Sequence, residues 1–159
     1  MYKLVNKVVQ SLEHIIPKRS KGLHDPYFRG NEKNYLINCI NSGYVSSVGK
    51  YVKTFEKKVA KLAKVKFSVA TNSGASALHL LLNNYNIGPN DEVLLPSLTY
   101  IATANAIKYC NSNLNFVDVD KNNLGICPIK LEIYLKKISK KKKNYYVNKK
   151  NGKRLKLLI

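Results

Sequence analysis

The sequence predicts an α/β fold with a mostly parallel sheet and flanking helices. Short apolar runs alternate with helix-like segments of about ten residues or more in the second part of the chain. Connections of that length suit parallel strands, because parallel strands need a long crossover between them. The 159 residues are 45% hydrophobic, which is enough for one domain with a core and is not the composition of a disordered chain.

Residues 1–29 are expected to form an amino-terminal helix followed by a polar loop. Apolar residues recur on one helical face: Val5, Val8, Val9, Leu12, Ile15 and Ile16. Pro17 is placed to stop this helix. The segment lacks the layout of a signal peptide, and no apolar run approaches the roughly 20 residues needed to cross a bilayer. We therefore expect a cytoplasmic protein without a membrane partner.

Residues 30–159 are expected to form the second region, in which helices come first and strands later alternate with helices. The first helix should begin at Asn31 and end at Gly43, since glycine favours the helix C-terminus, and residues 44–49 should form an extended link. The other predicted helices are 50–64, 74–86, 100–110 and 128–140. The predicted strands are 66–71, 92–96, 114–119 and 154–159.

The net charge of +19 is concentrated near the end of the sequence. Residues 136–159 hold 11 basic residues and no acidic residue. Such a block can bind nucleic-acid phosphates, but a lysine run is more often a solvated surface. Arginine, which reads bases best, occurs only three times. Nucleic-acid binding is therefore the less favoured alternative.

The cysteines and histidines predict neither a disulfide framework nor a metal site. Cys39, Cys110 and Cys127 are odd in number and far apart, so that structural thiols are the simpler interpretation. The three histidines are also isolated in the sequence, and no metal is expected.

Five small residues lie between a predicted strand and a predicted helix, in the sequence Ser73-Gly74-Ala75-Ser76-Ala77. In α/β sheets, ligands bind where strands end at their carboxyl edge. A helix start there offers unpaired N–H groups and a positive dipole end to a phosphate, and small side chains permit close approach. A serine N-cap at a tight junction explains the same residues about equally well.

A second strand-to-helix junction places Tyr100 at the start of the next predicted helix. An aromatic ring at this position could cover one face of a planar ligand whose phosphate lies at the first turn. A tyrosine that packs in the core is the alternative.

Several separate blocks of the sequence resemble the amino-terminal half of the DegT/StrS-type sugar aminotransferases. They include "SGYVSSVGKYV", "VATNSGASALHLLL", "VLLPSLTYIATANAI" and "NFVDVDKNNLGICP", in the order and spacing of that family over residues 22–159. Within the family, the resemblance is strongest to members of legionaminic-acid and bacillosamine-type pathways. It implies part of the large domain of pyridoxal phosphate (PLP) fold type I, truncated, and a homodimeric enzyme. It also implies transfer of an amino group, from glutamate as the donor, to a nucleotide-linked keto-sugar for surface-glycan synthesis.

The resemblance implies roles for individual residues. It places Gly74, Ala75 and Ser76 at the PLP phosphate, with alanine where the family usually has threonine, and it places the Tyr100 ring on the pyridine. The substrate loop would include Ser46, Ser47 and Gly49. Asp118 and Asp120 match the end of the family's "FVD" strand and are expected to be structural.

The resemblance also implies what the sequence lacks. The lysine that binds PLP covalently and the acidic partner of the pyridinium nitrogen would follow position 159 in the family's order, so that this chain alone is expected to be inactive. A non-catalytic remnant that binds the PLP phosphate is the alternative. Residues 136–156 would then be a linker helix and loop of the fold.

Overall fold

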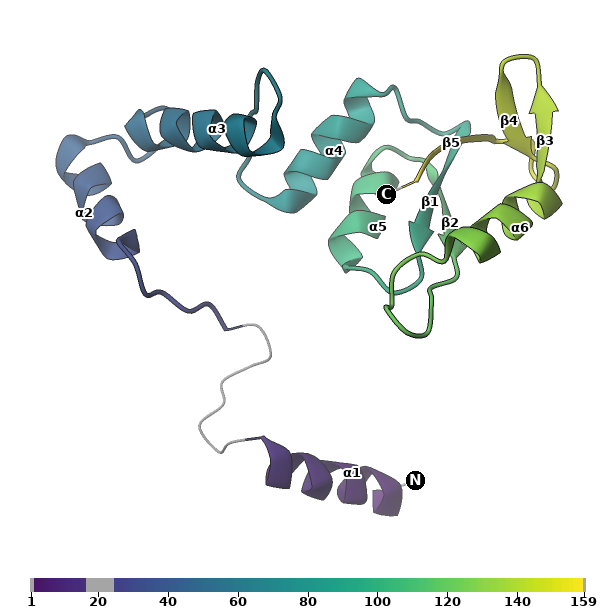
Figure 1. The fold of residues 1–159 in the computed structure, drawn as a ribbon, viewed down its shortest axis with the longest axis horizontal. Helices are drawn as coiled ribbons and strands as arrows, with labels where there is room; N and C mark the ends of the chain where they lie inside the picture. The colour runs from purple at the N-terminus through teal and green to yellow at the C-terminus, as the bar shows by residue number, and fades with distance from the viewer. Residues whose placement is uncertain (1, 17–24, 159) are drawn as a thin grey trace. The chain divides into compact units, whose positions relative to one another are not determined.

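The computed structural model describes residues 2–16 and 25–158 (Figure 1), and the chain consists of two units. One unit comprises residues 1–53, and the other comprises residues 54–159. Pro17, the expected stop of the first helix, lies outside the described residues. No helix in the described ranges is both long enough and apolar enough to cross a bilayer.

The first unit contains helices α1 (Tyr2–Ile15) and α2 (Glu32–Ser42) and the start of α3 (Lys50–Ala63). Gly43 ends α2 as predicted: its φ of 74° lies in the left-handed region, and its N–H donates to the carbonyl of Ile40. The Tyr35 and Tyr51 rings lie 5.0 Å apart, and the Asn38 amide donates to the Tyr51 hydroxyl at 3.2 Å. These contacts connect α2 to the beginning of α3.

The second unit contains a five-stranded sheet in the order β2-β1-β5-β4-β3. Its strands are β1 (Asp91–Pro96), β2 (Asn113–Val117), β3 (Ser139–Lys142), β4 (Tyr145–Asn148) and β5 (Arg154–Leu158). Strand β1 pairs in parallel with β2 and β5, whereas β4 pairs antiparallel with β3 and β5. The predicted α/β class is confirmed, and the sheet is mixed because the β3–β4 hairpin extends its parallel part.

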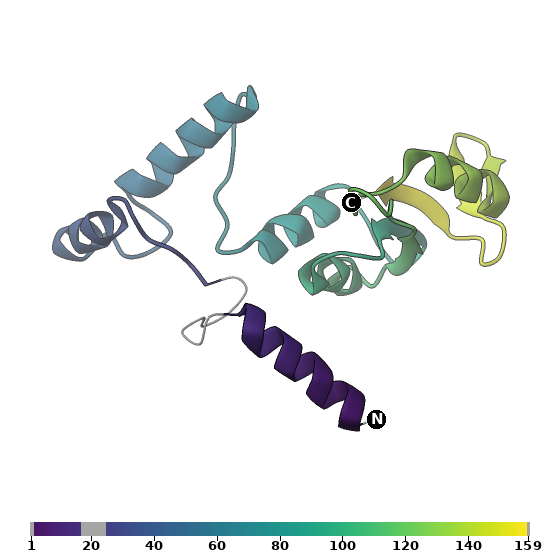
Figure 2. The same cartoon turned by 60° about the horizontal axis from the view of Figure 1, so that its bottom comes forward.

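Helices cover both faces of the parallel strands (Figures 1 and 2). Helices α4 (Gly74–Asn84) and α5 (Ile101–Tyr109) lie on one face, and α6 (Pro128–Ile138) lies on the other. The core on the first face consists of Leu82, Ile87, Val93, Leu95, Ala104, Ala106, Ile107 and Cys110. Because side chains alternate along a strand, Leu94 faces the opposite side, where it borders a cavity with Leu131 and Leu135 of α6.

The prediction of a strand over residues 66–71 is wrong. This segment pairs with no strand in the described part of the chain, and Phe67 and Val69 are 74% and 73% exposed. Glu56 of α3 holds the segment instead: its carboxylate accepts the Ala70 N–H at 2.9 Å, and its carbonyl accepts the Ser68 hydroxyl at 2.7 Å. An apolar run becomes a strand only when a neighbouring strand supplies hydrogen-bond partners.

The prediction of a linker helix and loop over residues 136–156 is wrong from residue 139 onward, because Ser139–Asn148 forms the β3–β4 hairpin. The Lys149 ammonium donates to the carbonyls of Lys136 and Lys137, at 3.3 and 2.8 Å, and the Lys149 N–H donates to the carbonyl of Ile138. These bonds satisfy the last carbonyls of α6, which therefore ends at Ile138. The buried side chain of Val147 fixes β4 against the sheet.

Two adjacent carboxylates at the start of β1 connect the sheet to its surroundings. Glu92 is 3% exposed and accepts the side-chain amides of Asn115, Asn148 and Asn151. Asp91 is 1% exposed and accepts the Arg154 guanidinium at 2.8 Å.

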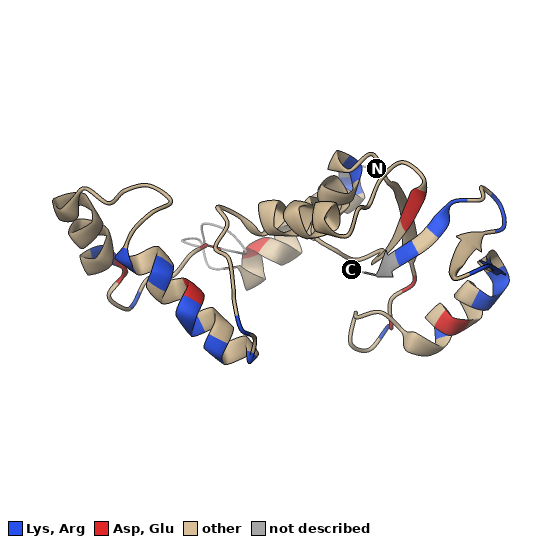
Figure 3. Cartoon of the chain, turned by 90° about the horizontal axis from the view of Figure 1, so that it is seen from above, with Lys and Arg blue, Asp and Glu red and all other residues tan. Residues whose placement is uncertain are grey.

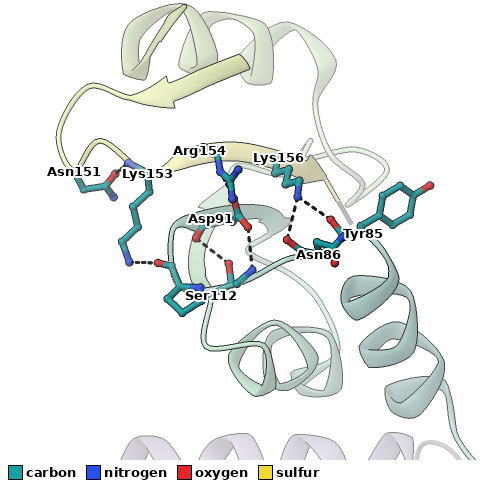
Figure 4. A network of polar contacts seen from close by, with 10 residues as sticks. Tyr85, Asn86, Asp91, Ser112, Asn151, Lys153, Arg154 and Lys156 are labelled. Atoms are coloured by element: carbon teal, nitrogen blue, oxygen red, sulfur yellow. Dashed lines mark hydrogen bonds and ion pairs between the residues drawn. The ribbon is translucent and has the colours of Figure 1, made fainter. Parts of the chain in front are cut away.

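Figure 4 shows the contacts of Asp91 in this network. It also shows the contacts that Lys156 of β5 and Lys153 of the turn before β5 make with backbone carbonyls. The Ser112 hydroxyl donates to the Asp91 carbonyl at 2.8 Å. Lys153 donates to the carbonyl of Pro89 at 2.9 Å, and Lys156 donates to the carbonyls of Tyr85 and Asn86 at 2.7 and 3.1 Å. One end of the segment between α4 and β1 is therefore held by Lys156 of β5, and the other end is held by Lys153 of the turn before β5.

We predict that Glu92→Ala lowers the free energy of unfolding by at least about 2 kcal/mol, because it leaves three amide donors without their buried acceptor. Urea unfolding followed by circular dichroism measures the change. Glu132→Ala is the matched control, since that carboxylate is exposed and, among the described residues, pairs only with Lys136 across one helical turn; about 0.5 kcal/mol or less is expected there. Equal effects of the two substitutions would contradict the role of Glu92.

Candidate cofactor site

The small-residue turn begins α4, and Ser73 is the N-cap of this helix. The backbone of Ser73 is extended, with φ −160° and ψ 160°, and its hydroxyl accepts the Ser76 N–H at 3.1 Å. The hydroxyls of Ser73 and Ser76 lie 3.0 Å apart. The serine cap that the sequence suggested is therefore present.

Among the described residues, the cap leaves two N–H groups at the helix start without a partner. Ser73 accepts the Ser76 N–H through its hydroxyl and the Ala77 N–H through its carbonyl. The N–H groups of Gly74 and Ala75 donate to no described residue of the chain. Because a helix start is also the positive end of the helix dipole, these two donors have the chemistry that anion binding at a helix start requires. The cap and an anion site are thus compatible.

No contact with a described residue explains the glycine at position 74. Its φ lies outside the left-handed region, so its backbone does not require glycine, and a Cβ atom added there would meet nothing within 4 Å. Glycine at this position nevertheless lowers helix stability relative to alanine. Close approach of a group that is not part of the chain is a physical reason for retaining it.

The second junction places Tyr100 at the N-cap of α5. Its backbone is extended, with φ −70° and ψ 136°, its side chain makes no capping bond, and it is 72% exposed. Thr103, one turn later, is buried, and its N–H donates to the Tyr100 carbonyl at 3.0 Å. The ring therefore projects outward and does not pack in the core.

The chain brings the starts of α4 and α5 to the same edge of the sheet. Residues 85–90 join the end of α4 to the start of β1, and Figure 1 shows α4 running toward the amino end of β1, so that the start of α4 lies away from that end. The 11 residues of α4 span about 16 Å, and the six residues of β1 span about 20 Å. Helix α5 follows β1 after the short segment 97–100, and the Ser97 N–H donates to the Val117 carbonyl of β2 at 3.0 Å.

The expected substrate loop lies in the first unit. Ser46 and Gly49 border a cavity of about 540 Å³ between α2 and the start of α3, and Ser47 is exposed in the same loop. Gly49 has a local structural reason, because a Cβ atom there would lie 3.3 Å from the Cβ of Tyr44.

The two aspartates after β2 differ in their contacts. Asp118 is exposed and lies 4.0 Å from the ammonium of Lys130. Asp120 accepts the N–H groups of Asn122 and Asn123 at 2.8 and 3.3 Å, which closes the turn after the strand. Asp120 is therefore a turn-forming residue.

The three cysteines are free. Cys110 belongs to the core, and burial raises the pKa of its thiol, so that it remains protonated and unreactive at neutral pH. In the described ranges, no three or more His, Cys, Asp and Glu side chains gather in a group that could hold a metal ion.

Sequence patterns did not identify the network of Asp91 and Glu92 or the free N–H groups of Gly74 and Ala75. Two adjacent acids at the start of an apolar strand were a signal for the network, because a buried carboxylate needs several hydrogen-bond donors. The free N–H groups had no signal of their own, since they depend on which groups the Ser73 cap already satisfies.

Comparison with known proteins identifies the family. Residues 26–143 match the model of the DegT/DnrJ/EryC1/StrS aminotransferase family. The chain belongs to this family. The cofactor of the family is PLP, and the members of the family include sugar aminotransferases, as the resemblance implied.

Two curated relatives and one solved structure illustrate the similarity. The GDP-perosamine synthase of Caulobacter vibrioides is 44% identical over 107 residues, which is 67% of this chain and 29% of that protein. The GDP-perosamine synthase of Vibrio cholerae is 38% identical over 121 residues, 76% of this chain and 32% of that protein. The solved structure is that of a putative sugar aminotransferase from Streptococcus pneumoniae in its PLP form. It is 26% identical to this chain with a TM-score of 0.61, and the match covers 68% of this chain and 27% of the solved chain.

These comparisons confirm that the fold is part of PLP fold type I. The chain spans about a third or less of the length of the proteins named above. The start of α4 fits the phosphate of PLP, because free N–H groups, a nearby hydroxyl and the absence of a side chain at Gly74 occur together.

Proposed function

We propose that the protein is the amino-terminal part of a PLP-dependent aminotransferase that transfers an amino group to a nucleotide-linked keto-sugar. The amino donor is an amino acid, glutamate, and the product enters surface-glycan synthesis. The whole enzyme is a cytoplasmic homodimer. The free, uncrowded helix start at Gly74 is the observation on which this proposal chiefly depends.

The substrate class rests on the relatives. Two of them are named GDP-perosamine synthases, and another, from Bacillus subtilis, is named a spore coat polysaccharide biosynthesis protein and is 37% identical over 125 residues. A nucleotide-linked sugar and a surface polysaccharide are consistent with these names. The loop with Ser46, Ser47 and Gly49 is proposed to contact the sugar nucleotide.

We propose that the N–H groups of Gly74 and Ala75 bind the phosphate of PLP. The Ser76 hydroxyl, which can either donate to Ser73 or turn outward, provides a third donor. The positive end of the α4 dipole adds a favourable electrostatic contribution to a dianion. Alanine at position 75 removes one hydroxyl relative to the family pattern and leaves its backbone donor intact.

The exposed ring of Tyr100 is proposed to cover one face of the cofactor's pyridine ring and to exclude water from it. When bound, PLP supplies the electron sink needed for amino-group transfer. The protein's part at these positions is to hold the cofactor and fix its orientation.

We predict that Gly74→Val weakens binding of pyridoxamine 5'-phosphate to the purified chain at least about tenfold, because a branched side chain occupies the position of the phosphate. Pyridoxamine phosphate is the better probe than PLP, since it has no aldehyde that would react with surface lysines. Fluorescence titration measures the dissociation constant, and inorganic phosphate should compete.

The matched control is Gly88→Val. Gly88 also lies in open space without a positive φ, but it precedes the amino end of β1. Its substitution should leave the dissociation constant unchanged. Equal binding by the Gly74→Val variant and the unmodified chain would exclude the phosphate role of this turn.

For Tyr100 we predict that substitution by alanine weakens pyridoxamine phosphate binding roughly tenfold, whereas substitution by phenylalanine changes it little. Ring stacking contributes about 0.5–1.5 kcal/mol beyond burial, and it depends on the aromatic face and not on the hydroxyl. The same titration distinguishes the two variants. Similar losses in both would mean that the hydroxyl acts and that stacking is not the role of this residue.

We further propose that none of the 25 lysines of this chain binds PLP covalently as the catalytic lysine. Treatment of the chain with PLP and borohydride should give scattered, partial labelling by peptide mass spectrometry, because free PLP reacts with any exposed amine. The labelling should be the same in the Gly74→Val variant. Full modification of one lysine, with turnover of glutamate and a nucleotide keto-sugar, is the result that would disprove this proposal.

A further inference from the structure

The β3–β4 hairpin is a basic projection with tyrosines on both faces. Lys142 lies opposite Tyr145 and Lys141 lies opposite Tyr146 in the antiparallel register. Because side chains alternate along each strand, one face presents Lys140, Lys142 and Tyr145, and the other presents Lys141 and Tyr146. Lys143, with φ 54°, forms the turn between the strands.

The cations of this hairpin have no carboxylate partner in the described part of the chain. The ion pairs nearby join Lys136 to Glu132 and Arg154 to Asp91. The lysines at positions 140–143 are exposed and take part in neither pair. Figure 3 shows basic residues along α6 and the strands beside it, with few acidic residues between them.

The hairpin lies at the opposite edge of the sheet from the candidate cofactor site. It pairs with the beginning of β5, at Arg154 and Leu155, and these residues align with Asp91 and Glu92 at the amino end of β1. The starts of α4 and α5 lie toward the carboxyl end of β1. The hairpin is therefore a second surface, which binding of the cofactor phosphate does not use.

We propose that the tip of this hairpin binds the surface of an anionic phospholipid bilayer. Four adjacent lysines match the clusters that attract anionic headgroups, and tyrosine suits the interface between headgroups and acyl chains. Lysines on both faces and at the turn all reach a planar surface only when the tip meets it end-on. A nucleic acid lying along one face would contact only part of the set, and arginine, its preferred partner, is absent from residues 139–148.

The test is sedimentation of the purified chain with vesicles that contain phosphatidylglycerol and with vesicles of phosphatidylcholine alone. We expect binding to the first and not to the second, with a decrease as salt rises. A fourfold glutamine variant should reduce the vesicle partition coefficient at least about tenfold. Its substitutions are Lys140→Gln, Lys141→Gln, Lys142→Gln and Lys143→Gln.

The matched control removes the same charge from exposed lysines of α3. Its substitutions are Lys53→Gln, Lys57→Gln, Lys58→Gln and Lys61→Gln, and it should keep at least about half of the partition coefficient if the hairpin is the contact. Circular dichroism establishes that both variants are folded. Equal loss in the two variants would show a general effect of net charge and overturn the proposal. Absence of vesicle binding, or tighter binding of duplex DNA or RNA than of vesicles at equal phosphate concentration, would also overturn it.

Discussion

The rest of the second unit depends on the two buried carboxylates of Asp91 and Glu92. These residues are adjacent in the sequence, so their side chains lie on opposite faces of β1. A buried carboxylate is tolerated only when donors surround it, and here the donors come from distant segments. Asn115 on β2 and Asn148 on β4 bind Glu92, and Arg154 on β5 binds Asp91. These strands must therefore assemble around β1 together, since each of them alone would leave an acid unsatisfied.

The contacts of Asp91 and Glu92 fix the position of the candidate cofactor site, although neither residue is part of that site. Polar contacts hold the amino end of β1, and Val93 and Leu95 hold its centre in the core. The position of β1 therefore fixes the start of α5, where Tyr100 lies. The same core fixes α4 beside α5 through Leu82. The start of α4, where we propose that the phosphate binds, therefore belongs to a helix that Leu82 anchors in the apolar core, while its own residues remain small and accessible.

The charge distribution has a related origin. Of the nine acidic residues, Asp91 and Glu92 are enclosed in the fold, where they bind Arg154 and three asparagine amides, and in the described part of the chain they form no ion pair with a lysine. The hairpin concentrates this imbalance, because an antiparallel register places its lysines on both faces of a short ribbon. Four lysines that are already adjacent in the sequence, at positions 140–143, come to lie on both faces and at the turn of one ribbon only through this folding.

The sequence by itself determined the α/β class, the family, the helix end at Gly43, the serine-capped helix start that contains Gly74 and the strand-to-helix junction that contains Tyr100. These features depend on local periodicity, on glycine and serine preferences and on motif order, all of which are readable along the chain. Only the tertiary structure decided that residues 66–71 form no strand and that the lysine-rich segment forms the β3–β4 hairpin. A strand forms only when it can make hydrogen bonds to a neighbouring strand. The lysine run forms a hairpin because Val147 is buried and the Asn148 amide donates to Glu92. Such partners lie far away in the sequence, and local pattern does not reveal them.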